Sequence, residues 1–384
     1  MKLRHLPFLL VLAGLPLALG AAFVHAQTQN GQVLERLPCD ERLTTGASLE
    51  IACLRLLYAQ PTTQWPAPHI DTGVAWKELA TLPSTPPAPA DNPATPEKIA
   101  LGRKLFEDPR LSLSGQIACA NCHDRQLGWS DGRSVSFGHD RQRGRRNSMG
   151  LAMSGYATSL FWDGRSSSLE EQALHPIEDA KEMAFTSKEL ERRLNRDSAY
   201  RNAFARVFGV RRIQTEQIAQ ALATFQRSLA PRNSRLDRFL AGRRDLLNDQ
   251  ELQGLHLFRT RARCMNCHNG ATLSDDKFHN LGLHFRGREL EDLGRYEVTG
   301  MPGDSGTFRT PSLRGVSRSG PWMHNGTFPQ LRGIVNFYNA GGAHPRPKPD
   351  QLDDPLFPKT DPLLKPLQLN KDERAALVAF LEAL

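Results

Sequence analysis

The apolar positions of this chain recur mainly at helical spacing, and several runs follow residues that favour helix starts. The pattern predicts helices over residues 97–106, 188–208, 215–229, 249–258 and 374–384. Strand patterns are sparse and glycine-containing loops are frequent. We therefore expect a mainly α fold with long irregular segments.

The first 26 residues form a separate pattern. Lys2 and Arg4 precede an apolar run over residues 6–23, which ends in Val-His-Ala at Ala26. This order is typical of a cleavable signal peptide. An uncleaved membrane anchor is the alternative, but the prolines and glycines of the run make a poor spanning helix. No later run approaches the ~18 apolar residues of a span, so the pattern predicts a periplasmic protein without stable membrane insertion.

Two copies of Cys-x-x-Cys-His are the most informative motif of the chain. Two thiols at this spacing can add to the two vinyl groups of one haem while the adjacent His reaches the iron. A zinc site or a redox dithiol is the alternative, but a His after both pairs in an exported chain favours covalent haem c. The predicted residues are Cys119, Cys122 and His123 for haem 1, and Cys264, Cys267 and His268 for haem 2.

The segments before the two motifs are related. Gly-Arg-Lys-Leu-Phe at residues 102–106 and Gly-Leu-His-Leu-Phe at residues 254–258 both lie in a predicted helix that leads to a motif. This repetition predicts two cytochrome c-like haem domains, at residues 95–240 and 241–384.

Residues 27–94 form an N-terminal extension that ends in a proline-rich linker. It contains the two cysteines outside the haem motifs, Cys39 and Cys53, for which an oxidising compartment makes a disulfide the expectation. The segment is either a docking piece or a structural wrap.

The charge of the chain bears on its partners. A formal charge of +8 falls to +6 when Lys2 and Arg4 leave with the signal peptide. This balance suits an acidic protein partner. The compartment and the lack of a recognition motif argue against nucleic acid.

A set of short segments accompanies the haem motifs from about Thr95 to the C-terminus. They are Leu-Gly-Arg-Lys-Leu-Phe at 101–106, Arg-Asn-Ser at 146–148, Phe-Trp-Asp-Gly-Arg at 161–165, Leu-Glu-Glu-Gln-Ala at 169–173, Lys-Glu-Met at 181–183, Arg-Thr-Pro-Ser-Leu-Arg at 309–314 and Phe-Tyr at 337–338. In this order and spacing, the chain resembles the bacterial di-haem cytochrome c peroxidases, and within them the MauG-like branch. The resemblance implies that haem 1 reacts with peroxide and that haem 2 transfers electrons.

The resemblance also implies roles around haem 1. It makes Glu182 the distal acid/base, with Gln172 and Pro176 shaping its pocket, and a carboxylate desolvated beside haem can both take and deliver a proton. It makes Trp162 the bridge between the haems, where an indole can relay charge. From the residues alone, Glu182 reads more readily as one of several surface acids, and Trp162 as a core aromatic.

The other iron ligands follow from the same resemblance. Tyr338 matches the sixth ligand of haem 2, with Met323 as the rival, and a phenolate should lower the potential relative to a thioether. His139 matches a loop histidine that caps haem 1 in oxidised resting enzymes of the family, although it reads equally as an exposed loop residue.

A calcium ion between the domains is also implied by the resemblance. Its protein ligands would be the side chain of Asn147 and the backbone carbonyls of Ser319 and Pro321. Oxygen ligands with several waters suit calcium.

These observations predict a periplasmic di-haem c-type peroxidase that reduces hydrogen peroxide with electrons from a small cytochrome c or cupredoxin, as a monomer or homodimer. The alternative is a MauG-like enzyme that uses peroxide to oxidise Trp or Tyr of a protein substrate. A plain di-haem electron carrier is the third hypothesis, and it has no use for a distal acid.

Overall fold

The computed structural model describes residues 50–231 and 234–384. The chain divides into two compact units, Met1–Leu56 and Leu57–Leu384. The predicted signal peptide and Cys39 lie outside the described residues, so the cleavage site and the disulfide to Cys53 stay predictions. In the part that the structure describes, no helix has the length and apolar character needed to cross a membrane.

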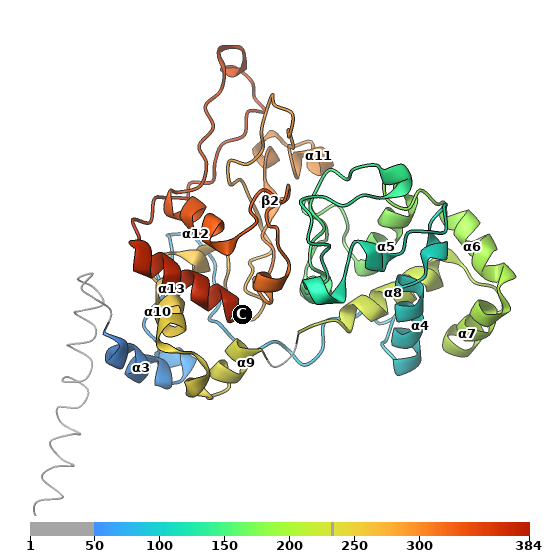
Figure 1. The fold of residues 1–384 in the computed structure, drawn as a ribbon, viewed down its shortest axis with the longest axis horizontal. Helices are drawn as coiled ribbons and strands as arrows, with labels where there is room; N and C mark the ends of the chain where they lie inside the picture. Colours follow the sequence, from blue (N-terminus) through green and yellow to red (C-terminus); the bar gives the residue numbers. More distant parts are fainter. Residues whose placement is uncertain (1–49, 232–233) are drawn as a thin grey trace, which may run out of the picture. The chain divides into compact units, whose positions relative to one another are not determined.

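The described chain is mainly helical with long loops, as the sequence predicts (Figure 1). Its α-helices are α3 (Ile51–Ala59), α4 (Pro96–Phe106), α5 (Leu169–Glu178), α6 (Ser187–Arg196), α7 (Ser198–Phe208), α8 (Thr215–Arg227), α9 (Arg235–Leu240), α10 (Asp249–Arg259), α11 (Tyr296–Thr299), α12 (Leu331–Asn339) and α13 (Lys371–Glu382). Strands β1 (Phe278–His279) and β2 (Phe308–Arg309) pair antiparallel.

Short 3₁₀ turns connect these elements, and two of them begin at the first Cys of a haem motif. They are η1 (Thr62–Gln64), η2 (Pro109–Leu111), η3 (Cys119–Asn121), η4 (Arg125–Leu127), η5 (His139–Arg141), η6 (Leu151–Tyr156), η7 (Arg244–Leu246), η8 (Cys264–Asn266), η9 (Pro302–Asp304), η10 (Val316–Arg318) and η11 (Pro349–Gln351).

Capping residues decide where several helices begin. Asn248 caps α10 as predicted, with its side chain accepting a hydrogen bond from the Glu251 amide at 2.9 Å. The prediction of one helix over residues 188–208 was wrong, because Asp197 divides it. Its carboxylate accepts a hydrogen bond from the Ala199 amide at 2.7 Å and so starts α7 as a new helix.

The repeat seen in the sequence is also a repeat in packing. Helix α4 packs on α8, and α10 packs on α13. A Cβ atom on Gly102 would lie 2.0 Å from the carbonyl oxygen of Ala221, and one on Gly254 would lie 2.0 Å from that of Ala376. Each motif is therefore preceded by a helix that contacts its neighbour through a glycine, which brings the two backbones together.

The Gly102→Ala variant should test this contact. An added methyl group must push α4 away from α8, and overpacking of this kind costs about 1–3 kcal/mol of unfolding free energy. The matched control is Gly333→Ala in α12, where the new Cβ would meet only Phe328, at 3.3 Å. Thermal unfolding of the haem-loaded proteins should show a lower midpoint for Gly102→Ala alone. Equal midpoints for both variants would refute the close-packing argument.

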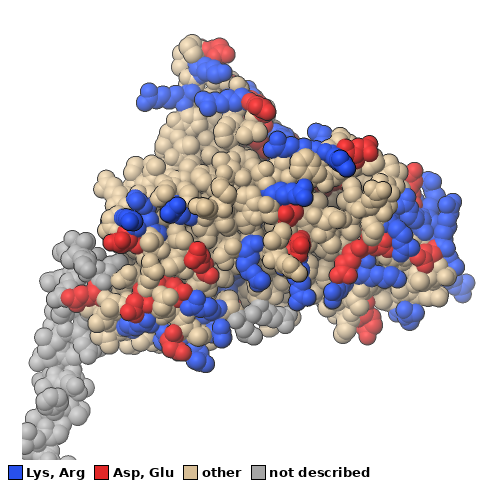
Figure 2. Space-filling model, in the orientation of Figure 1, with Lys and Arg blue, Asp and Glu red and all other residues tan. Residues whose placement is uncertain are grey.

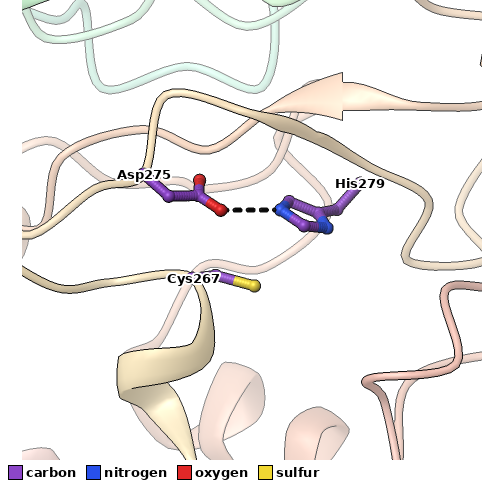
Figure 3. A group of neighbouring side chains, drawn as sticks. All are labelled: Cys267, Asp275 and His279. Atoms are coloured by element: carbon purple, nitrogen blue, oxygen red, sulfur yellow. Dashed lines mark hydrogen bonds and ion pairs between the residues drawn. The ribbon is translucent and has the colours of Figure 1, made fainter. Parts of the chain in front are cut away.

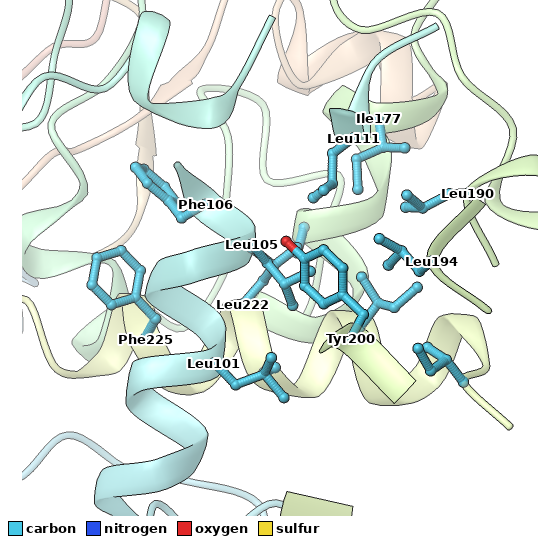
Figure 4. Packing of buried hydrophobic residues seen from close by; sticks show 14 of the residues in the cluster. Leu101, Leu105, Phe106, Leu111, Ile177, Leu190, Leu194, Tyr200, Leu222 and Phe225 are labelled. Atoms are coloured by element: carbon cyan, nitrogen blue, oxygen red, sulfur yellow. The ribbon is translucent and has the colours of Figure 1, made fainter. Parts of the chain in front are cut away.

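Helices α4 to α8 enclose an apolar core next to the first haem motif (Figure 4). Leu105 and Tyr200 are fully buried there, and the Tyr200 hydroxyl donates a hydrogen bond to Asp108 at 2.6 Å. Phe106, at the end of α4, lies 6.4 Å from the ring of His123. The core therefore positions the end of α4 directly against the motif.

Residues 57–94 of the N-terminal extension, called the wrap below, include a stretch that packs against the chain around the second motif, and a docking role for the extension stays a prediction. The Asp71 amide donates to the Asn266 side chain at 2.8 Å, and the Lys77 amide donates to the Asn269 side chain at 3.1 Å. The guanidinium of Arg259 has no exposed surface and forms an ion pair with Glu78 at 2.5 Å. These contacts fasten the segment to the chain around the second motif.

Candidate active site

One large cavity contains both haem motifs. Its volume is about 1320 Å³, and its wall includes all four motif cysteines together with His123 and His268. Apolar side chains such as Phe106, Leu222 and Val335 form much of the remaining wall. A large and mostly apolar space beside each motif fits the covalent haems that the sequence predicts.

Both motif histidines are oriented for iron ligation. The Nδ1 atom of His123 lies 2.8 Å from the carbonyl oxygen of Trp129, and that of His268 lies 3.0 Å from the carbonyl oxygen of Leu273. Donation from Nδ1 leaves the Nε2 lone pair for a metal. Burial lowers the pKa of both rings, which favours the neutral form that binds iron.

Trp129 and Leu273 were missed by sequence reasoning, because they act through the backbone. Both have left-handed conformations, with φ of 64° and 53°. Side chains other than glycine seldom adopt this region. The same uncommon backbone conformation therefore places a carbonyl oxygen next to Nδ1 of each predicted iron ligand, His123 and His268.

The motif thiols are poorly suited to redox exchange. Burial raises the pKa of Cys122 to about 11 and that of Cys119 to about 12, so both stay protonated near neutral pH. This argues against the dithiol alternative. Among the described residues, the group of His, Cys and carboxylate side chains close enough to share an ion is Cys267, Asp275 and His279 (Figure 3).

Glu182 lies on the cavity wall in the loop after α5. Gln172 and Pro176 line the same cavity from α5, one helical turn apart. Burial, together with the nearby Asp179, raises the pKa of Glu182 to about 7. A carboxyl group in this state can exchange a proton in either direction at neutral pH.

A second, smaller cavity also borders Glu182. Its volume is about 250 Å³, and it is lined by Arg165, His175, Pro176, Glu178, Asp179 and Glu182. Four of these residues, Arg165, Pro176, Asp179 and Glu182, also line the large cavity. The His175 side chain is 43% exposed, so this polar space lies close to the surface.

Trp162 connects the segments that contain the two motifs. Its indole Nε1 donates to the Asn147 carbonyl at 3.0 Å, and its own carbonyl accepts from the Arg309 amide of β2 at 2.8 Å. Next to it, Arg146 forms ion pairs with Asp163 and, at 2.7 Å, with Asp292. The indole lies on the wall of the cavity that both motifs line, and its bridging role stays a prediction.

Tyr338 and Met323 both line the large cavity. Tyr338 projects from α12, and burial, with smaller effects from Cys267 and Cys264, raises the pKa of its phenol. Met323 lies in a loop with φ of 69°. Cys267 and Cys264 influence the Tyr338 phenol, which places it by the second motif. The loop of Met323 contacts the segment of Asn147, whose amide donates to the His324 carbonyl at 2.7 Å.

His139 is not part of the cavity wall. Its Nε2 atom lies 3.4 Å from the Asp140 carboxylate, while its backbone amide donates to the Glu182 carbonyl at 2.8 Å. The loop therefore packs beside Glu182 with the imidazole turned elsewhere. Ligation of haem 1 by His139 stays a prediction.

The predicted calcium ligands come from two facing loops. Asn147 is buried, and its side-chain amide donates to the Arg133 carbonyl at 2.9 Å. A Cβ atom on Gly150 would lie 3.3 Å from the Cβ of Ser319, and Pro321 follows in the same loop with a cis peptide bond. The loops are adjacent, and the calcium site itself stays a prediction.

Known proteins match this chain over most of its length. A family model described as di-haem cytochrome c peroxidase matches residues 96–245. The cytochrome-c peroxidase IdrP1 of Pseudomonas sp. (strain SCT) is 37% identical over 335 residues, which cover 80% of this chain and 85% of that protein. The methylamine utilization protein MauG of Methylophilus methylotrophus is 36% identical, with coverage of 80% and 88%.

Solved structures agree. The crystal structure of a MauG-like protein associated with microbial copper homeostasis superposes with a TM-score of 0.71 at 32% identity, covering 80% of this chain and 95% of that one. The resemblance inferred from the motifs is thus confirmed, and two haem c groups are implied by the family. The chain belongs to the di-haem cytochrome c peroxidase family, and it is a haem oxidoreductase.

Proposed function

We propose that this protein reduces hydrogen peroxide to water in the periplasm, at a haem held by His123 in a domain over residues 95–240. A second haem, held by His268 in a domain over residues 241–384, receives electrons from a small cytochrome c or cupredoxin. The overall reaction consumes one peroxide, two electrons and two protons and gives two waters. The observation that best supports it is the carboxyl of Glu182 on the wall of the cavity that the first motif also lines, with its pKa raised to about 7.

Haem iron would supply the site at which the peroxide O–O bond is cleaved. Side chains of the protein accept and donate the protons of the reaction. Glu182 takes a proton from the peroxide oxygen nearest the iron and returns it to the departing oxygen, which leaves as water. Gln172 and Pro176 limit the space around the substrate. The small polar cavity between Glu182 and the half-exposed His175 is the entry route for peroxide and water.

Basic surface charge on the proposed haem 1 domain suits an acidic protein partner. On the face shown in Figure 2, basic side chains gather at the right edge, over α6 and α7. The basic residues of these two helices are Lys188, Arg192, Arg193, Arg196, Arg201 and Arg206. Such a surface attracts a negatively charged protein and speeds its association at low salt.

Oxidation of a protein substrate is the second candidate, and the ligand set of haem 2 favours it. Tyr338 is the proposed sixth ligand of haem 2. A methionine ligand at this position would favour the reduced state of the haem, whereas the phenolate of a tyrosine favours the oxidised state. MauG proteins are among the relatives at 36% identity. In this version Trp162 passes the oxidising equivalent from haem 1 to haem 2, and the substrate binds near haem 2.

Peroxide consumption by the purified protein tests these proposals. Reduced small cytochrome c is the donor, and enzyme started fully oxidised is compared with enzyme reduced at one haem. Turnover only after reduction indicates gating by His139, and turnover from both states indicates a haem 1 open at rest. Negligible turnover from either state, with a long-lived spectral change after peroxide, supports oxidation of a protein substrate.

The Trp162→Phe variant should slow charge transfer between the haems. Phenylalanine is much harder to oxidise than tryptophan, so the relay is lost while most of the packing remains. The matched control is Trp322→Phe, because Trp322 lines the same cavity and donates its indole N–H to the Val316 carbonyl at 3.0 Å. Rapid mixing of half-reduced enzyme with peroxide should show slower oxidation of haem 2 in Trp162→Phe alone. Equal rates in both variants would count against the relay.

A further inference from the structure

A compact charged cluster lies beside the second haem motif (Figure 3). His279, in β1, is placed between two carboxylates. Its Nδ1 atom lies 2.6 Å from Asp361, and its Nε2 atom lies 3.0 Å from Asp275. Ligand atoms of Cys267, Asp275 and His279 all lie within 4.8 Å of one another. The cluster therefore borders the sulfur that would be bonded to haem 2.

The hydrogen bonds define the charge of the cluster. A carboxylate only accepts hydrogen bonds, so both ring nitrogens of His279 must donate, and the ring is an imidazolium. Burial alone would lower the pKa of His279, but the bonds to Asp275 and Asp361 outweigh it and raise the pKa. Burial opposes ionisation of the two carboxyls as well, yet the bonds from His279 hold their pKa values below the usual range. One positive and two negative charges leave a net charge of −1.

The two aspartates are held in place by hydrogen bonds of the backbone. The Asp275 amide donates to the Cys267 carbonyl at 2.8 Å, and the Lys277 amide donates to the Asp275 carboxylate at 3.0 Å. The Asp361 carboxylate accepts from the Leu363 amide at 2.9 Å. All three side chains are largely buried, at 6% exposed for Asp275, 14% for His279 and 18% for Asp361. The charges are therefore fixed in position and only partly screened by water.

Nearby charges do not cancel the cluster. Asp276 is neutralised by an ion pair with Arg309 of β2 at 2.8 Å. On the other side, Arg263 and Lys365 both pair with Asp71 of the wrap. A shared metal ion is a poor explanation, because both ring nitrogens of His279 already bond to carboxylates and the Cys267 sulfur is needed for haem attachment.

We propose that the Asp275–His279–Asp361 cluster sets the reduction potential of haem 2 through the charge that it fixes beside Cys267. Reduction adds one negative charge to the haem, so a net negative cluster at its edge disfavours reduction and lowers the potential. The three residues act on the haem through space and are positioning residues. The proposal rests on a haem attached at the second motif and does not require the proposed peroxidase activity.

Two substitutions with opposite expected signs test the proposal. His279→Gln removes the positive charge and should lower the potential of haem 2. Asp361→Asn removes one negative charge and should raise it. Asp353→Asn is the matched control, since Asp353 is exposed in the same loop, and it should leave the potential unchanged. Spectroelectrochemical titration of the haem-loaded proteins at pH 8, without peroxide, measures both haems, and haem 1 is an internal reference.

The direction of each shift decides the outcome. A purely structural disturbance would move both variants the same way, so shifts of one sign, or no shift, would overturn the proposal. If His279→Gln fails to load haem, Asp361→Asn and Asp275→Asn decide the matter, because each removes one negative charge and should raise the potential. If either of these two variants fails to raise the potential of haem 2, the proposal is also overturned. Since peroxide is absent, loss of peroxidase activity cannot mimic any of these results.

Discussion

Replacing Glu182 with glutamine should slow the reaction with hydrogen peroxide by about 10²–10⁴-fold. Glutamine preserves the size of the side chain and the shape of the cavity wall, but it cannot accept the proton of bound peroxide. Stopped-flow mixing with peroxide measures the rate of the haem spectral change, and steady-state turnover with a reduced donor measures the whole reaction. Both should fall together, because the loss affects a step common to both.

Glu178→Gln is the matched control for this variant. Glu178 also lines the small cavity, but it is not on the wall of the large one, and it accepts a hydrogen bond from the Ser187 hydroxyl. The same change of charge there should leave the reaction with peroxide unchanged. If Glu182→Gln reacts with peroxide as fast as the unmodified protein, the acid/base role of Glu182 fails.

Thermal unfolding separates loss of chemistry from loss of folding. The pKa of Glu182 is raised by burial to about 7, above the value of ~4.3 for an exposed Glu. The folded state therefore binds this proton more tightly than the unfolded state, and the group's contribution to stability falls as pH rises from about 4.3 to about 7. Glutamine removes that penalty. At pH 8 the variant should unfold at the same or a higher temperature.

The reaction with peroxide should also depend on pH. Glu182 must be ionised to take a proton, so the rate should rise as pH increases through about 7 and then level off. Glu182→Gln should lose this rise. If the rate still rises with pH in the Glu182→Gln variant, a group other than Glu182 is responsible for the pH dependence.

The Tyr338→Met variant should raise the reduction potential of haem 2 and change its spectrum. A neutral thioether stabilises the reduced iron, whereas a phenolate stabilises the oxidised iron. Spectroelectrochemical titration and the absorption spectrum of the oxidised protein measure both effects. Haem 1 should be unaffected, because Tyr338 lies near the second motif, as the influence of Cys264 and Cys267 on its pKa shows.

Two further variants identify the ligand. Met323→Leu removes the rival donor and should leave the haem 2 spectrum unchanged. Tyr296→Phe in α11 controls for the loss of a tyrosine hydroxyl elsewhere. If Met323→Leu alters the spectrum and Tyr338→Met does not, Met323 is the ligand and the tyrosine assignment is wrong.

The sequence pattern predicted helices well where the residues that cap the helix lie next to its first turn. The capping box at Asn248 and the Thr-Pro-Glu start of α4 were read correctly, because a cap and its first turn lie within four residues. Asp197 was overlooked, since apolar spacing continues across it while its carboxylate starts a new helix. Helix α5 was not predicted, although its sequence contributed to the resemblance.

The sequence by itself determined the haem chemistry and the family. Two Cys-x-x-Cys-His motifs define attachment through covalent spacing that no distant contact alters. The tertiary structure alone decided which groups surround the haems. The carbonyls of Trp129 and Leu273 depend on backbone conformation, the raised pKa of Glu182 depends on burial, and the His279 cluster joins residues 82 positions apart. Burial and long-range contact arise from the packing of the whole chain, so local patterns do not report them.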